Sequence, residues 1–177
     1  ENKWESFINE WYKDAGKRKF DIAESYPKDS LCPKWCYNMW NPFPVVSMDK
    51  QEDTERNKKA LQMFLGHIDV LTNFNKTHSD FVILWLRQMF QFPEYKSIEL
   101  IFISEEGAGK GTFLTFLQTM MGGQRRVWEC TDPLRDIFGS FNDGMVDAML
   151  VCFNESSKAN FYNSNDKKKG LITDSTI

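Results

Sequence analysis

The fold of this chain is decided by residues 97–113, which read SIELIFISEEGAGKGTF. Within it, residues 98–103 form a short apolar run rich in β-branched side chains and without helical spacing, which predicts a buried β-strand. A glycine-rich segment follows at residues 104–112, and an apolar helical pattern then runs from Phe113 to Met121 and is closed by two glycines. The two glycines mark the end of the helix, because glycine commonly ends helices. The order of these patterns predicts a strand, a glycine-rich loop and a helix.

The composition of this loop is typical of a phosphate-binding loop. Glycines let the backbone curl so that N–H groups point at phosphate oxygens, and the helix N-terminus adds a partial positive charge. Lys110 is expected to reach the β and γ phosphates, and Thr112 to supply the hydroxyl that binds Mg²⁺. The predicted nucleotide-binding residues are Glu106, Gly107, Ala108, Gly109, Lys110, Gly111, Thr112 and Phe113.

Two positions of the loop depart from the common pattern G-x-x-x-x-G-K-[ST]. Ser104 stands where the first glycine belongs, and Gly111 follows the lysine, which displaces the hydroxyl to Thr112. The lysine is therefore better specified than the metal ligand. A glycine-rich turn with a surface lysine is the alternative interpretation of the same residues.

A second candidate element ends in an acid. Residues 147–153 are apolar enough for a strand, and Asn154 and Glu155 follow directly. The interval from Lys110 to Glu155 accommodates a helix, a strand and a return, so both could meet at the carboxyl edge of a parallel sheet. There Glu155 would orient water and accept its proton, and Asn154 would bond to a metal-bound water. A solvated Asn-Glu turn is the alternative.

The rest of the chain divides into a helical part and an alternating part. Large apolar side chains at helical spacing predict helices over residues 4–11, 51–71 and 79–91, with an irregular, packed connector over residues 26–44. A further strand is predicted at residues 127–130. We therefore expect two domains, a helical N-terminal region over 1–95 and an α/β core over 96–177 with a parallel sheet and flanking helices.

Composition narrows the class of protein further. The 177 residues carry a net charge of −3 and a pI near 5.5, so the chain lacks the basic field of a self-sufficient nucleic-acid binder. Four cysteines are too few for a disulfide scaffold and favour a reducing, intracellular compartment. No apolar run is long enough for a membrane span, and a soluble protein is expected. The ends, Glu1 and Ile177, favour a piece of a longer chain.

These residues together resemble the superfamily 3 helicases, in particular the helicase half of the viral and phage primase-helicases. The resemblance extends from about Cys36 to the end and rests on the order and spacing of several short pieces. Those pieces are residues 37–40 (YNMW), 85–93 (WLRQMFQFP), 107–113 (GAGKGTF), 141–142 (FN), 153–155 (FNE) and 171–173 (LIT).

The resemblance implies an AAA+-like P-loop core, preceded by a helical collar used in oligomerisation. It also implies a homo-hexameric ring that hydrolyses ATP with Mg²⁺ and moves along single-stranded DNA, with a covalently linked primase upstream and no membrane partner. Lys167, Lys168 and Lys169 resemble the start of a DNA-facing segment. The sensor residue and the trans-acting arginine would lie past Ile177, and a viral replication site in the host cell would be the location.

Two other classes of function remain open at this point. The loop also resembles that of adenylate kinases, although those enzymes need more arginines than the three that follow Lys110. A degenerate loop that serves only as a nucleotide-binding scaffold is the second alternative. A zinc site built from Cys32, Cys36, His67 and His78 fits no standard ligand spacing, so structural cysteines are expected instead.

Overall fold

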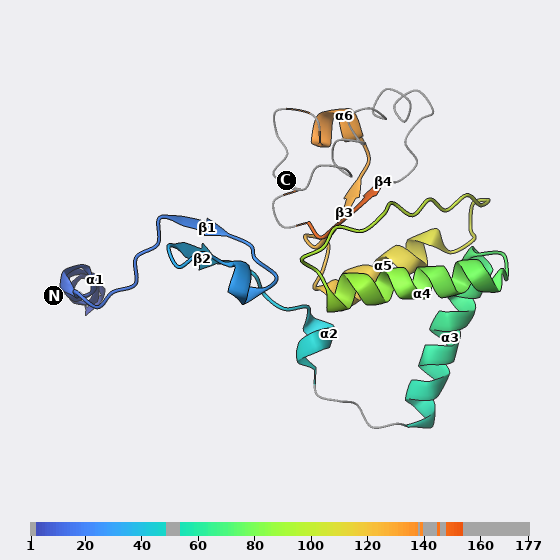
Figure 1. Cartoon of the computed structure of the whole chain (residues 1–177), viewed down its shortest axis with the longest axis horizontal. Coiled ribbons are helices and arrows are strands. Elements are labelled where there is room, and N and C mark those ends of the chain that lie inside the picture. Colours follow the sequence, from blue (N-terminus) through green and yellow to red (C-terminus); the bar gives the residue numbers. More distant parts are fainter. Residues whose placement is uncertain (1–2, 49–53, 138, 140–144, 146–147, 154–177) are drawn as a thin grey trace. The chain divides into compact units, whose positions relative to one another are not determined.

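The computed structural model describes residues 3–48, 54–137, 139, 145 and 148–153, and these form a mixed α/β structure of helices and short parallel strands (Figure 1). The chain divides into two compact units, Glu1–Asn41 and Pro42–Ile177. The α/β class predicted from the sequence is therefore confirmed, whereas the boundary near residue 95 stays a prediction. No helix among the described residues is long and apolar enough to cross a membrane.

The first unit combines one helix with a small parallel sheet. Helix α1 (Lys3–Lys13) is the predicted amphipathic helix, and its Phe7, Ile8 and Trp11 are exposed. Strands β1 (Ile22–Glu24) and β2 (Cys36–Asn38) lie side by side, with a 3₁₀ turn, η1 (Asp29–Leu31), between them in the chain (Figure 1). The first 95 residues are therefore not all helical. The sequence did not predict β1 and β2, because strands of three residues are too short to show an alternating pattern.

Asn38 organises the irregular connector of the first unit. Its Oδ1 accepts hydrogen bonds from the backbone N–H groups of Tyr26 (2.9 Å) and Trp40 (3.0 Å). Its Nδ2 donates to the backbone carbonyl of Tyr26 (3.0 Å) and to Oδ1 of Asp29 (2.7 Å). One amide side chain therefore ties the segment before η1 to the end of β2, as asparagine commonly does in turns. The expected close packing is only partial, because Trp35 is exposed.

Three helices of the second unit begin and end near the predicted residues. After the short helix α2 (Pro44–Ser47), α3 (Glu55–Leu71) and α4 (Lys76–Gln91) start at Thr54 and Asn75, whose side chains accept hydrogen bonds from N–H groups of the first turn. Helix α4 ends just before Pro93, as expected. Helix α5 (Lys110–Met121) ends at Gly122, which has φ +103°, a conformation that favours glycine.

A buried polar cluster fixes the corner between α3 and α4, which run at a steep angle to each other (Figure 1). Ser79 donates a hydrogen bond to Oδ1 of Asp69 (2.6 Å), and its hydroxyl lies 2.7 Å from that of Thr72. Because the Ser79 hydrogen goes to Asp69, the single hydrogen of the Thr72 hydroxyl is shared between Ser79 and the backbone carbonyl of Ile68 (2.9 Å). Both hydroxyl residues are buried, so each group depends on these partners.

Replacing Ser79 by alanine is expected to lower the free energy of unfolding by about 1–3 kcal/mol, because Asp69 and Thr72 lose a buried partner. Urea denaturation followed by circular dichroism measures the change. Thr77→Ala is the matched control, since Thr77 is exposed on the first turn of the same helix. Equal midpoints for the two variants would contradict the role given to the cluster.

The hydrophobic core of the second unit brings α3, α5 and the second sheet together. The Phe64 ring of α3 stacks on Phe116 of α5 with centroids 4.1 Å apart, and Phe102 meets Phe113 edge to face at 5.7 Å. Leu117, Met121, Val127 and Cys130 are almost fully buried. Helix α5 contacts β3 (Val127–Cys130), so the helix that follows the glycine-rich loop packs directly on a strand.

The second sheet consists of β3 and β4 (Leu150–Phe153), which run parallel as predicted (Figure 1). Val127 pairs with Leu150 and Cys130 with Phe153, so the carboxyl ends of both strands lie at the same edge. The short helix α6 (Pro133–Asp136) follows β3. The parallel arrangement requires the crossover between the strands that the sequence predicted.

The strand predicted at residues 98–103 is wrong for the described structure. This segment has no hydrogen-bonded strand partner among the described residues, and Ile103 is 94% exposed. One side chain of α4 holds the start of the segment instead, since the Trp85 Nε1–H donates to the carbonyl of Ile98 (3.0 Å). An apolar β-branched run specifies strand propensity, but a strand also needs a neighbour to accept its ladder of hydrogen bonds.

Candidate phosphate-binding loop

The glycine-rich loop turns at two glycines before it enters helix α5. Gly107 has φ +78° and Gly109 has φ +92°, both in the left-handed region that side chains disfavour. Helix α5 begins at Lys110, with Gly109 as its N-cap, and the Phe113 N–H donates to the Gly109 carbonyl (3.1 Å). The loop therefore turns at two glycines and leads directly into a helix, but the strand predicted before it is absent from the described structure.

The N-terminus of α5 has no side-chain cap, because Gly109 carries no side chain that could accept a hydrogen bond. The first N–H groups of a helix lack intrahelical acceptors and carry a partial positive charge. In this helix those groups belong to Lys110, Gly111 and Thr112. An anion with several oxygens is the ligand that suits such an end.

Lys110 folds back over the start of the loop. Its Nζ donates to Oγ of Ser104 (2.7 Å) and to the carbonyls of Ser104 and Glu105 (both 3.2 Å). The serine that replaces the first glycine of the common pattern thus supplies one of three acceptors for the ammonium group. The Lys110 ammonium therefore lies against the loop in which it is predicted to bind phosphate.

The remaining loop residues are open to solvent or partly so. Glu106, Gly107, Gly111 and Thr112 are exposed, and Ala108 is half-buried. A Cβ added to Gly107 or Gly111 would meet no atom within 4 Å, so space exists beside both backbones. Phe113 is buried and anchors the first turn of α5 in the core. The loop is therefore anchored in the core by Phe113, while its other side remains accessible to solvent.

His67 is a loop contact that sequence reasoning missed. Its Nε2 lies 3.0 Å from the carbonyl oxygen of Gly109, although the two residues are 42 positions apart. The sequence offers His67 only as a metal ligand, and no local signal connects a histidine in the second half of α3 with the loop. Among the described residues, no group of three potential metal ligands gathers at any point.

The acidic half of the predicted site lies outside the described residues. Strand β4 ends at Phe153, and Asn154 and Glu155 follow directly. Because Phe153 pairs with Cys130, the chain leaves β4 at the same sheet edge at which it leaves β3. The meeting of Glu155 with Lys110 stays a prediction, as does the DNA-facing role of residues 167–169, which also lie outside the described part.

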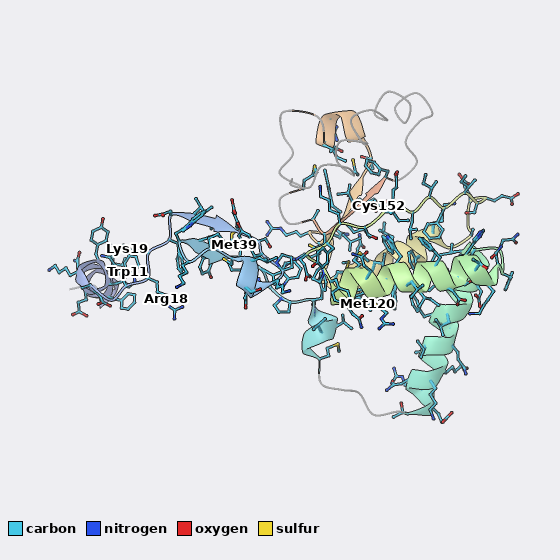
Figure 2. All side chains as sticks on the ribbon, viewed as in Figure 1. Trp11, Arg18, Lys19, Met39, Met120 and Cys152 are labelled. Atoms are coloured by element: carbon cyan, nitrogen blue, oxygen red, sulfur yellow. The ribbon has the colours of Figure 1, made fainter. Side chains whose placement is uncertain are left out.

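Cys130 and Cys152 lie in surroundings that disfavour the thiolate form. Burial raises the pKa of the Cys130 thiol to about 11, and the neighbouring Asp136 carboxylate acts in the same direction. Burial also raises the pKa of Cys152, which lies on β4 (Figure 2). Since the thiolate is the reactive form, both side chains are neutral and inert near pH 7. All four cysteines are free thiols, so a structural role is consistent with their environment.

Two cavities lie away from the loop. An apolar one of about 210 Å³ is lined by side chains of α3, α4 and α5, including Met120 (Figure 2) and Arg87. A second of about 460 Å³ lies beside β3, at Gln118, Trp128 and Glu129. Neither includes a residue of the glycine-rich loop. The exposure of Glu106, Gly107, Gly111 and Thr112 places the loop at the surface of the described part of the chain.

Comparisons of the chain with protein-family models, with curated proteins and with solved structures find no match. The class of protein must therefore be argued from the chemistry of the site, because a fold alone does not determine a function. The strongest element of that chemistry is the loop from Ser104 to Phe113.

Proposed function

We propose that this chain carries the nucleotide-binding part of a P-loop ATPase of the superfamily 3 helicase type. The observation that supports this most is the loop itself: two glycines with positive φ, an uncapped helix N-terminus, and the Lys110 ammonium folded over the loop. Together they offer N–H donors and a cation to a chain of phosphates. The ligand class is a nucleoside triphosphate, and ATP is the proposed substrate.

The described residues fit ATP and Mg²⁺ by their chemistry. The N–H groups at the start of α5 and the Lys110 ammonium would hold the phosphate oxygens, and the exposed Thr112 hydroxyl is a suitable ligand for a hard cation. Magnesium, when bound, neutralises charge that develops on the phosphates. Lys110 would exchange its three bonds to Ser104 and Glu105 for bonds to phosphate, which is a local rotation of one side chain.

The proposed hydrolysis needs a residue that prepares water. Glu155 is the candidate general base, since a carboxylate within hydrogen-bond reach can orient water and take its proton during attack on the γ phosphorus. Asn154 would bond to water on the magnesium without adding charge. The parallel pairing of β3 with β4 supports this placement, because the chain leaves β4 at the carboxyl edge of the sheet.

The wider assembly follows from the resemblance. In a homo-hexameric ring, ATP would sit between subunits and its hydrolysis would drive movement along single-stranded DNA, with residues 167–169 near the DNA phosphates. A primase domain upstream and a viral replication site in the host cell belong to the same proposal. An arginine from the neighbouring subunit would add about 10³ to 10⁵ in rate, so ATP turnover is expected to depend on assembly of the ring.

Two alternative functions compete with the helicase. A nucleoside monophosphate kinase would use the same loop, and a scaffold would bind nucleotide without hydrolysis. The departures at Ser104 and Gly111 keep the scaffold open, although the 2.7 Å bond from Lys110 to Ser104 shows that the serine accommodates the lysine.

DNA-stimulated ATP hydrolysis by a longer chain that continues past Ile177 separates the three functions. The helicase proposal predicts phosphate release that rises when single-stranded DNA is added. Formation of ADP from ATP and AMP without DNA would favour the kinase instead. Nucleotide binding without either reaction would favour the scaffold and contradict the proposed ATPase.

A further inference from the structure

The contact between His67 and Gly109 joins the helix α3 to the loop. The backbone carbonyl oxygen of Gly109 can only accept, so the His67 Nε2, at 3.0 Å, carries a hydrogen and donates it. The same oxygen accepts from the Phe113 N–H at 3.1 Å. Two donors from different helices therefore hold one carbonyl group at the point where α5 begins.

The imidazole also occupies the space beside Gly109. A Cβ added to this residue would lie 2.3 Å from Cε1 and 3.1 Å from Nε2 of His67, closer than such atoms approach in proteins. Gly109 must therefore be glycine for two independent reasons, its φ of +92° and the ring packed against it. At Gly107 only the first reason applies, since nothing lies within 4 Å of an added Cβ.

Fixing the Gly109 carbonyl also fixes the next N–H. A peptide unit is planar and trans, so the C=O of Gly109 and the N–H of Lys110 point in opposite directions. When His67 and Phe113 hold the oxygen, the Lys110 N–H is directed away from α3. This N–H is one of the uncapped donors at the start of α5.

The helix that carries His67 is itself anchored on α5. Phe64, one turn before His67, stacks on Phe116 with centroids 4.1 Å apart and lies parallel to Phe113 at 6.4 Å. The buried Ile68 adds a second anchor directly after the histidine. The imidazole is thus presented to the loop from a packed surface and not from a free side chain.

We propose that His67 is a positioning residue for the phosphate-binding loop, which holds Gly109 in place and couples α3 to the nucleotide site. The identity of the ligand, a nucleotide, rests on the proposed function. The contact between His67 and Gly109 is independent of it. His67 acts through the backbone and does not touch the nucleotide. Any shift of α3 would alter the direction of the Lys110 N–H and with it the affinity for phosphate.

The nucleotide arm of the test measures the affinity of the chain for a fluorescent ATP analogue in the presence of Mg²⁺. His67→Ala is expected to weaken binding about fivefold to tenfold, the effect of one lost hydrogen bond. His67→Gln, which keeps an amide donor near the position of Nε2, should recover most of the affinity. His78→Ala is the matched control, because the side chain of His78 is exposed on the first turn of α4.

The stability arm needs no nucleotide and uses a double-mutant cycle. Gly109→Ala should lower the melting temperature strongly in the wild-type chain and clearly less in the His67→Ala background, where the ring is gone and only the positive φ remains unfavourable. Additive shifts would overturn the proposal whether or not ATP binds. If the wild-type chain binds no nucleotide, the proposed function fails, and a non-additive cycle would still establish that His67 holds the loop.

A further outcome would overturn the positioning role while leaving the proposed function intact. If the wild-type chain binds the ATP analogue and His67→Ala binds it equally well, His67 does not govern the loop. Equal loss of affinity in His67→Ala and His67→Gln would also contradict the proposal, because the donor would then be irrelevant.

Discussion

Replacing Glu155 by glutamine is expected to reduce ATP hydrolysis by about 10² to 10⁴-fold in a chain long enough to form the ring, while ATP still binds. Glutamine has nearly the same size as glutamate, but it cannot accept a proton from the attacking water. Binding should persist because the loop and Lys110 hold the phosphates. Phosphate release under saturating ATP measures the rate, and titration with a fluorescent ATP analogue measures the affinity.

Glu10→Gln is the control for this change, since it removes the same charge from an exposed position on α1, in the other unit. It should leave the rate unchanged. If Glu155→Gln hydrolyses ATP as fast as the wild type, Glu155 is not the base. The proposal would then lose its catalytic residue, although the loop could still bind nucleotide as a scaffold.

Replacing Lys110 by alanine is expected to weaken ATP binding about 10- to 100-fold, and to abolish hydrolysis in the longer chain. The Lys110 ammonium lies on the loop, where it bonds to Ser104 Oγ, and hydrogen bonds to charged groups contribute about 1.5–3 kcal/mol each. Equilibrium titration with a fluorescent ATP analogue measures the loss. The expected loss also falls with salt, because phosphate and ammonium are both accessible.

Lys59→Ala serves as the matched control, because it removes one exposed lysine from α3 without touching the loop. Circular dichroism of both variants checks that the helices remain, since Lys110 also bonds to Ser104 and Glu105. Similar affinities for Lys110→Ala and Lys59→Ala would mean that ATP, if it binds at all, binds elsewhere.

The elements that the sequence predicted well are those whose signal is local. Helices α3, α4 and α5 show many turns of one apolar pattern, and capping residues such as Thr54 and Gly122 mark their ends. The turns at Gly107 and Gly109 agree with the glycine-rich composition of the loop, because glycine adopts positive φ without steric cost. Local chemistry was enough in both cases.

The elements that were missed depend on contacts between distant parts of the chain. Residues 98–103 have the composition of a strand, but the described structure gives them no strand partner. The sequence of a segment does not show whether another strand will pair with it. The bond from His67 to Gly109 joins positions 42 apart and no spacing rule predicts it. The three-residue strands β1 and β2 were too short to show a period.

Amide chemical shifts of the loop test the central claim most directly. The chain would be labelled with ¹⁵N and titrated with a non-hydrolysable ATP analogue and Mg²⁺, and the backbone amides of the described residues followed. The largest saturable shifts are expected at Gly107, Gly109, Lys110 and Gly111. Saturable shifts centred on other residues, or no shift at any analogue concentration, would contradict a phosphate-binding role for this loop.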